Sequence, residues 1–219
     1  MQSSGLTAFV VRLLLVLGCV SSAAVATDWT RANREQALEQ TRSTQLEKRR
    51  LAYGRLAEIG TMEDIPVLLA ALWDEEELIR GMAEQSVWGI WMRTDDSVVD
   101  PLFQTGMLLI AQDDPQAAIE KLDQVIELKP DFAEAWNRRG NAYAALGDED
   151  RALADYDRTI ALNPYQFGTL ESCGEIWMTR RNYRKAADYF RRALDLNPNL
   201  PEAAEALHAL EKKLENDRI

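Results

Sequence analysis

Residues 133–164, AEAWNRRGNAYAALGDEDRALADYDRTIALNP, decide the fold of this chain. Their apolar positions fall at helical spacing on two faces, Trp136, Tyr143 and Leu146 on the first and Ala152, Tyr156 and Ile160 on the second. Gly147 is placed to end the first helix, because glycine readily takes a positive φ. Asn163-Pro164 ends the second, because proline disfavours helical geometry in the residue before it. The segment therefore predicts a helical hairpin.

The same pattern recurs 34 residues before and after this hairpin. Small residues and prolines keep the register in three columns: Gly106, Gly140 and Gly174; Ala118, Ala152 and Ala186; Pro130, Pro164 and Pro198. Large apolar residues keep it in four more: Leu102, Trp136 and Leu170; Leu109, Tyr143 and Trp177; Leu122, Tyr156 and Phe190; Leu128, Leu162 and Leu196. Seven columns in register predict three stacked hairpins.

The small columns predict where the two helices of a hairpin approach most closely. A large side chain at Gly140 should force the helices apart, at a cost of about 1–3 kcal/mol. Helix starts are marked at Asp100-Pro101 and Asp114-Pro115, where a capping Asp precedes a Pro at the first helical position. The repeats end before residues 201–219, whose single apolar stripe predicts one helix that caps the array.

The repeat resembles the tetratricopeptide repeat, whose W-x2-L-G-x2-Y…A-x3-F…P pattern appears here with Arg139 in place of the usual Leu. The matching residues are Trp136, Gly140, Tyr143, Ala152, Tyr156 and Pro164, with weaker matches in the first repeat. The resemblance covers residues 97–200. It implies an all-α, right-handed α-solenoid of helical hairpins, in which the first helices of successive repeats line a concave groove that holds an extended peptide or a partner helix.

By this resemblance, the groove positions are Phe103, Met107 and Ile110, then Glu134, Asn137, Arg138 and Asn141, then Glu171, Glu175 and Met178. Asn137 and Asn141 lie one turn apart and are suited to hydrogen-bond a peptide backbone. The alternative is that all of these residues form ordinary exposed helix surface.

The carboxylate-clamp subclass of the family binds the C-terminus of a chaperone with Lys, Asn and Arg. Asn141 and Arg138 fit that pattern. However, Phe103 stands at one Lys position, and Gly168 and Ser172 stand at a Lys and an Arg position. The resemblance therefore argues against a carboxylate ligand.

Residues 27–96 precede the repeats and lack their columns. Their apolar spacing predicts helices over 31–59, 65–73 and 76–92. This stretch resembles a HEAT-like repeat through Leu56-Ala57-x-Ile59-Gly60, Asp64-Ile65-Pro66, Leu68-Leu69-x-x-Leu72, Asp74 and Ile79-Arg80. The resemblance implies that Asp74 and Arg80 tie the turn to a helix.

A single repeat unit buries its faces on its neighbours. We therefore expect residues 27–96 to dock on the first tetratricopeptide helix and to form one curved solenoid with it. The docking residues are expected to be Trp88, Ile90, Trp91 and Met92.

Residues 1–26 have the features of an export signal: Arg12, an apolar run over 13–20, and Ala24-x-Ala26 in the small-x-small form that a signal peptidase accepts. Cleavage after Ala26 predicts a periplasmic or secreted protein. An uncleaved membrane anchor and a lipid at Cys19 are the alternatives. After cleavage Cys173 would be the only cysteine, which leaves no internal disulfide.

Composition and motifs exclude several classes of function. The formal charge of −11 argues against a nucleic-acid partner, since phosphates need a surplus of Lys and Arg. No metal-binding or phosphate-binding motif is present, so no catalytic residue, metal or cofactor is expected. His208 is expected to face solvent, and Cys173 to pack in the core.

Three functions remain open at this point. The first is an exported, non-catalytic adaptor that binds a protein or peptide in its groove. The second is a structural subunit whose groove is filled by its own N-terminal helix or by self-association. The third is a lyase-like enzyme, since some HEAT-like families have such an activity, but the sequence supplies no candidate set of catalytic residues for it. Glu171 and Glu175 lie one turn apart and could serve acid–base work, but a solvated or partner-facing side of the helix explains them as well.

Overall fold

The computed structural model describes residues 32–216, and every regular element in that range is helical. A helix over 32–40 comes first. It is followed by α2 (Leu46–Ile59), the 3-10 turn η1 (Met62–Asp64), α3 (Ile65–Ala71), α4 (Glu77–Trp91), α5 (Val99–Ala111), α6 (Pro115–Leu128), α7 (Ala133–Ala145), α8 (Glu149–Leu162), α9 (Phe167–Thr179), α10 (Tyr183–Leu196) and α11 (Pro201–Asn216).

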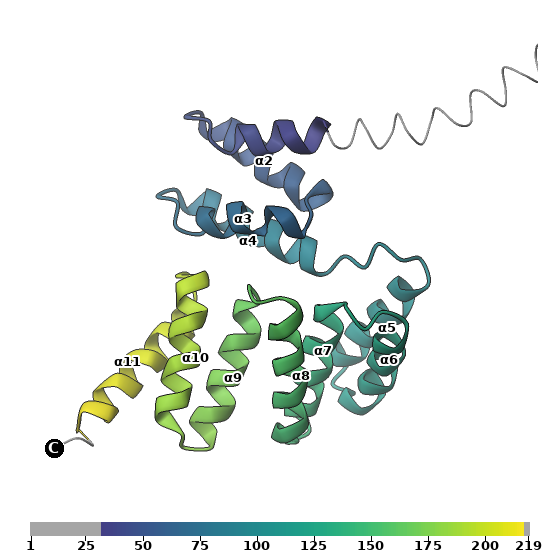
Figure 1. Ribbon diagram of the computed structural model, residues 1–219, viewed down its shortest axis with the longest axis vertical. Helices are drawn as coiled ribbons and strands as arrows, with labels where there is room; N and C mark the ends of the chain where they lie inside the picture. The colour runs from purple at the N-terminus through teal and green to yellow at the C-terminus, as the bar shows by residue number, and fades with distance from the viewer. Residues whose placement is uncertain (1–31, 217–219) are drawn as a thin grey trace, which may run out of the picture.

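The three predicted hairpins are confirmed as α5–α6, α7–α8 and α9–α10, and α11 packs on the last of them as the predicted cap. They stand side by side in one row, as the solenoid prediction requires (Figure 1). The glycine column lies at the tightest crossing. A Cβ added at Gly140 would lie 2.6 Å from Tyr156 Cε1, and one at Gly174 would lie 2.8 Å from Phe190 Cε1.

The turns inside the hairpins share one backbone conformation. Gly147 takes a φ of +76°, as its sequence position predicts. Asp113 and Arg181 occupy the same place in the first and third repeats, with φ of 59° and 58°. These two residues therefore hold a left-handed conformation that glycine adopts at lower cost.

One of the two predicted helix caps is correct. Asp114 accepts a hydrogen bond from the Ala117 amide at 3.1 Å, with Pro115 opening α6. The prediction for Asp100 is wrong, because α5 begins at Val99, two residues before the predicted first helical residue Pro101. The side chain of Asp96 provides the N-terminal hydrogen bonds instead, accepting from the amides of Val98 and Val99 at 2.8 and 3.2 Å.

The predicted helix over 31–59 is interrupted at residues 41–45, so this prediction is corrected. The hydroxyl of Thr41 donates to the carbonyl of Leu38 at 2.7 Å, and the hydroxyl of Ser43 accepts from the Gln45 amide at 3.1 Å. Such local bonds from Ser and Thr compete with helical ones. They turn the chain so that α2 folds back beside the helix over 32–40.

Arginines tie the N-terminal helices together. Arg34 pairs with the buried carboxylate of Asp64 at 2.8 Å, and Arg93 donates to the carbonyls of Gly60 and Ala57 at the end of α2. Arg80 donates to the carbonyl of Asp74 at 2.9 Å, which is the link that the HEAT-like resemblance implies. Membership of that family stays a prediction.

The N-terminal unit, residues 32–94, docks on a different part of the array from the one we expected. Trp88 and Trp91 pack against Phe167, with ring centroids 5.7 and 5.2 Å apart, so they meet the start of α9 and not the first repeat helix. Ile90 stays inside the N-terminal unit, beside Gly60. Only Met92 reaches the apolar cluster of the first repeat. In Figure 1 the unit crosses the ends of the repeat helices as a second layer.

Candidate functional site on the inner face of the repeats

The predicted groove residues all lie on the first helices of the repeats, α5, α7 and α9, but they differ in accessibility. Phe103 is only 3% exposed, and its ring packs edge-on against Phe132 with centroids 5.0 Å apart. It belongs to the core of the first repeat. Its assignment as a partner-binding residue is therefore wrong.

Glu134 is the centre of a buried hydrogen-bond network. Its carboxylate accepts from Arg138 Nε at 2.6 Å, Asn137 Nδ2 at 3.2 Å and Gln166 Nε2 at 2.6 Å. Burial raises the pKa of Glu134, and the charge of Arg138 opposes that rise. Asn137 also accepts from the Thr169 hydroxyl at 3.0 Å. Glu134 and Asn137 therefore join α7 to the third repeat and do not face a partner, which corrects both assignments.

Arg138 is covered by the N-terminal unit. Beyond its bond to Glu134, it lies 3.6 Å from the sulfur of Met92 and 5.8 Å from the ring centroid of Trp88. A cation over the face of a tryptophan ring is an attractive contact. The side of α4 that carries Trp88 and Met92 therefore closes this end of the inner face.

The rest of the inner face is open. Met107, Ile110, Asn141 and Glu171 are half-buried, whereas Glu175 and Met178 are exposed. The Asn141 carbonyl oxygen accepts from the Tyr156 hydroxyl at 2.8 Å, which fixes the amide and directs its nitrogen as a donor. We refer to Asn141, Glu171, Glu175 and Met178 as the open inner face.

The two carboxylates of the open inner face, Glu171 and Glu175, have raised pKa values. Burial raises the pKa of Glu171, and the neighbouring carboxylates of Glu175 and Glu202 raise it further. Burial also raises the pKa of Glu175. Glu202, from the first turn of α11, was not among the predicted site residues because it lies outside the repeat columns. A nearby cation would relieve this repulsion.

The other features considered from the sequence are the cysteine Cys173, a metal site and a membrane span. Burial raises the pKa of Cys173 to about 12, so its thiol is a core group, as predicted. Within residues 32–216 no cluster of His, Cys, Asp or Glu is arranged to hold a metal ion. No helix in the same range is long and apolar enough to span a bilayer.

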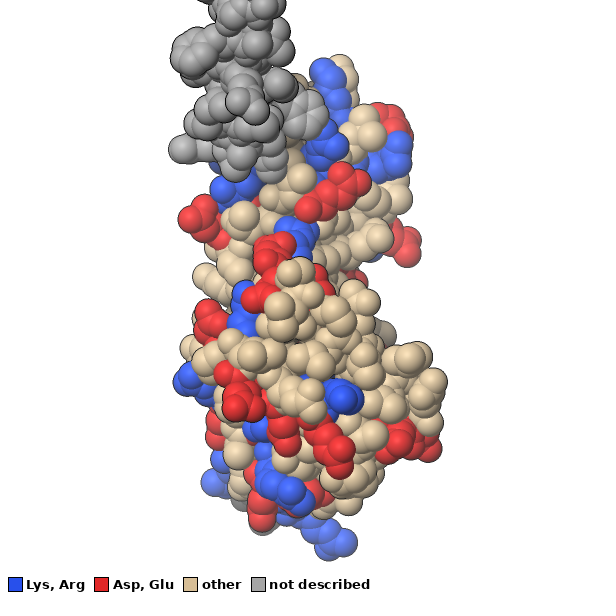
Figure 2. All heavy atoms as spheres, turned by 90° about the vertical axis from the view of Figure 1, so that its right-hand side faces the viewer, with Lys and Arg blue, Asp and Glu red and all other residues tan. Residues whose placement is uncertain are grey.

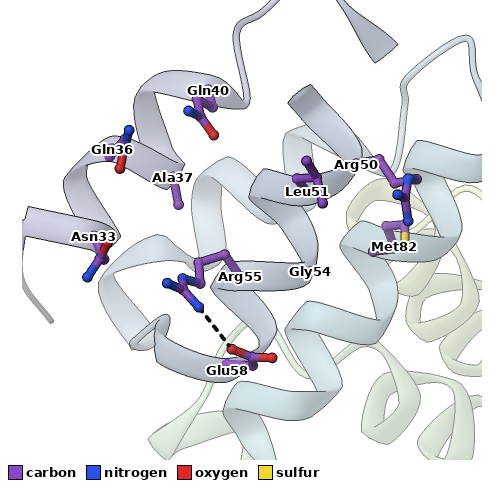
Figure 3. Close-up of a pocket in the computed structure, with 10 residues that line it drawn as sticks. All are labelled: Asn33, Gln36, Ala37, Gln40, Arg50, Leu51, Gly54, Arg55, Glu58 and Met82. Atoms are coloured by element: carbon purple, nitrogen blue, oxygen red, sulfur yellow. Dashed lines mark ion pairs between the residues drawn. The ribbon is translucent and has the colours of Figure 1, made fainter. Parts of the chain in front are cut away.

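A hollow of about 460 Å³ lies between the helix over 32–40 and α2 (Figure 3). Side-chain amides of Asn33, Gln36 and Gln40 line one side, and Arg55, paired with Glu58 at 3.5 Å, lines the other.

On the face that carries α5 and α6, acidic and basic side chains are interspersed with uncharged ones (Figure 2). Neither surface gathers groups that suggest a reaction.

Comparison with known proteins supports the repeat assignment. Tetratricopeptide repeat models match residues 103–167 and 169–200. A TPR repeat-containing protein of Rhizobium etli is 29% identical over 128 residues, which cover 58% of this chain and 63% of the relative. The SGT1 homolog of Bos taurus is 32% identical over 96 residues, 44% of this chain and 28% of the relative. The chain thus spans less than two thirds of these relatives.

Solved structures agree in fold. The first TPR of Spaghetti (RPAP3), bound to the HSP90 peptide SRMEEVD, has a TM-score of 0.52 at 23% identity and covers 55% of this chain and 96% of that one. The Sgt2 TPR domain of Aspergillus fumigatus also has a TM-score of 0.52, at 18% identity, and covers 56% and 83%. Together with the three hairpins and their glycine crossings, the family-model matches show that residues 103–167 and 169–200 of this chain are tetratricopeptide repeats.

Proposed function

We propose that this chain is a non-catalytic scaffold that binds a protein or peptide segment on the open inner face. One observation carries the proposal: Asn141 and Glu171 are partly exposed and Glu175 and Met178 are exposed on the first helices of the repeats, although Arg138 on the same face is covered by α4. In the solved TPR domain of Spaghetti, a short peptide is bound. Because this chain has a repeat array of the same fold, its inner face offers a comparable surface on which a peptide can bind.

Asn141 suits recognition of a peptide backbone. Its carbonyl oxygen is already used by Tyr156, so its amide nitrogen can donate to a carbonyl of the bound segment. Main-chain hydrogen bonds of this kind tolerate many sequences. Met178, 38% exposed, adds an adaptable apolar contact.

An acidic terminus such as SRMEEVD does not suit this surface. Arg138 is engaged by Glu134 and covered by α4, and Phe103 is buried. The open inner face itself carries two carboxylates, which would repel an anionic segment. The scaffold therefore binds a segment that is not acidic.

We place the scaffold in the periplasm or outside the cell. The support is the export-signal pattern of residues 1–26, which lie outside the described residues. Retention of that segment as an anchor, or a lipid at Cys19, would instead hold the scaffold at a membrane.

A second candidate is a structural subunit whose groove is partly filled by its own chain. The contacts of Trp88 and Met92 with Arg138 favour it, because they already occupy one end of the inner face. This alternative predicts that no partner depends on the open inner face. Light scattering after size exclusion would reveal self-association of the full chain.

The experiment is capture of proteins from the producing cells on immobilised full chain. Replacing Asn141 and Glu175 by Ala should reduce recovery of a specific partner several-fold. The matched control replaces Glu120 and Glu127, both exposed on α6. Recovery that is unchanged in the inner-face variant, or equally reduced in the control, would reject the proposed site.

A further inference from the structure

We infer that the partner-binding surface continues from the open inner face onto the exposed side of α4, and that this acidic corner takes a positively charged amphipathic segment of a partner protein. The inference rests on the proposed function and gives the partner a chemical class. It also gives the N-terminal unit a direct role in binding.

One side of α4 forms a continuous stripe that is accessible at its start and covered by the repeats at its end. Its members follow at helical spacing: Leu78, Gly81, Met82, Gln85, Trp88 and Met92. The last two pack on the repeats. The first four line a groove of about 670 Å³ whose opposite edge is Asn199, in the loop before α11. Leu78 is 49% exposed there, and a Cβ at Gly81 would meet no atom within 4 Å.

This groove, which we call the α4 groove, adjoins the open inner face at the starts of α9 and α11. Trp88 lies 3.5 Å from the Cβ position of Gly168, which is three residues before Glu171 on α9. Asn199 is three residues before Glu202, and Glu202 is close enough to influence Glu171. A bound segment can therefore contact both surfaces at once.

Carboxylates outnumber cations at this corner. Glu77 and Glu84 line the α4 groove, and Glu171, Glu175 and Glu202 follow on the repeats. The single cation of the groove lining, Arg80, donates to the backbone carbonyls of Asp74 and Glu75. Among the described residues, none of the five carboxylates has an ion pair within 4.0 Å.

Apolar side chains lie among these carboxylates. Leu78 and Met82 face the α4 groove, and Met178 lies on the open inner face. A segment with Lys or Arg on one side and apolar residues on the other matches both features. Charge complementarity thus commits the surface to a basic amphipathic segment, and an acidic one would meet repulsion.

The test uses three fluorescein-labelled model peptides that form the same leucine-faced helix, with Lys, Gln or Glu at every polar position. Fluorescence anisotropy with the full chain measures their affinities at low and at physiological salt. We expect the Lys peptide to bind at least about tenfold more tightly than the Gln peptide, the equivalent of ~1.4 kcal/mol, and the Glu peptide to bind weakest.

Two variants locate the binding. Glu171→Gln with Glu175→Gln should weaken the Lys peptide about tenfold, whereas Glu120→Gln with Glu127→Gln on α6 removes the same charge and should change affinity less than about twofold. Gly81→Trp fills the α4 groove without adding charge and should weaken binding to a similar extent. Gln124→Trp, on the exposed side of α6, is its control.

Equal losses in the α6 controls would mean non-specific attraction by a protein of charge −11 and would overturn the inference. Equal affinity for the three peptides would also overturn the inference, as would an affinity for the Lys peptide that Gly81→Trp leaves unchanged. The proposed function fails separately, when the captured cellular partner does not depend on Asn141 and Glu175. Circular dichroism of each variant verifies that it is folded.

Discussion

At the residue scale, the three glycines of the glycine column differ in how much space surrounds them. At Gly140 and Gly174 an added methyl group would strike the aromatic ring of the second helix within 2.9 Å. At Gly106 it would lie 3.2 Å from Cδ2 and Cγ of Leu122, which is a smaller clash. The sequence predicts the same role for all three glycines, because spacing does not record how closely the opposite side chain approaches.

Gly140→Ala should therefore destabilise the chain by about 1–3 kcal/mol, because the methyl group overpacks against Tyr156. Gly106→Ala should be close to neutral, since the gain of up to ~1 kcal/mol in helix propensity offsets a smaller clash. Urea denaturation followed by circular dichroism measures both. Equal losses at the two positions would contradict this account of the crossings.

At the left-handed turn residues we expect introduction of a glycine, instead of its replacement, to affect stability. Arg181 holds a φ of 58° where the second repeat has Gly147. Arg181→Gly should raise stability by about 0.5–1 kcal/mol, because relief of the left-handed backbone outweighs the added freedom of the unfolded chain. The melting temperature provides the measurement. Gly147→Ala is the converse control and should lower it.

At the element scale, the repeat hairpins follow from the sequence because each one is encoded within its own 34 residues. The helical spacing of apolar residues and a proline after the second helix suffice. Which residues of the inner face are accessible could not be predicted from the sequence in the same way. Glu134 and Asn137 look like groove residues within their helix, but Gln166 and Thr169 of the next repeat bury them. The residue pattern within one repeat does not show which of its side chains the next repeat will bury.

The carboxylates of α9 predict a pH dependence. The pKa values of Glu171 and Glu175 are raised in the folded chain, so the folded state takes up these protons before the unfolded one. Their unfavourable contribution is present above the raised pKa values and is lost as the pH falls toward the unfolded value of about 4.3.

Glu171→Gln with Glu175→Gln should thus raise stability at pH 7 by a fraction of ~1 kcal/mol, and the gain should vanish near pH 4. Thermal unfolding at a series of pH values measures the difference from the wild type. A gain that persists unchanged in acid would show that charge is not its cause.

At the scale of the whole molecule, the N-terminal unit is a second layer on the repeat array. The sequence identified the aromatic residues that dock, but it placed them on the adjacent first repeat. The actual partner, Phe167, is the first residue of α9 and belongs to none of the seven columns. Asn197 and Asn199 add bonds to Glu84 and to the Leu72 carbonyl, more than a hundred residues away in the chain. Such distant pairings leave no periodic signal.

Trp88→Ala should loosen the two layers at a cost of about 3–5 kcal/mol, because it removes a large ring from contact with Trp91, Phe167 and Arg138. Hydrogen exchange resolved by peptide should show faster exchange at the start of α9 and along α4, with less change in α6. Uniform acceleration throughout the chain would mean that the layers unfold as one unit.

The most direct test of the central claim is site-specific photo-crosslinking in the producing cells. A photoreactive phenylalanine replaces Met178, on the open inner face, or Leu128, exposed at the end of α6. We predict a discrete crosslinked partner from position 178 and none from position 128. Crosslinking from position 128 alone, or equal crosslinking from both, would contradict the claim that the inner face of the repeats holds the partner.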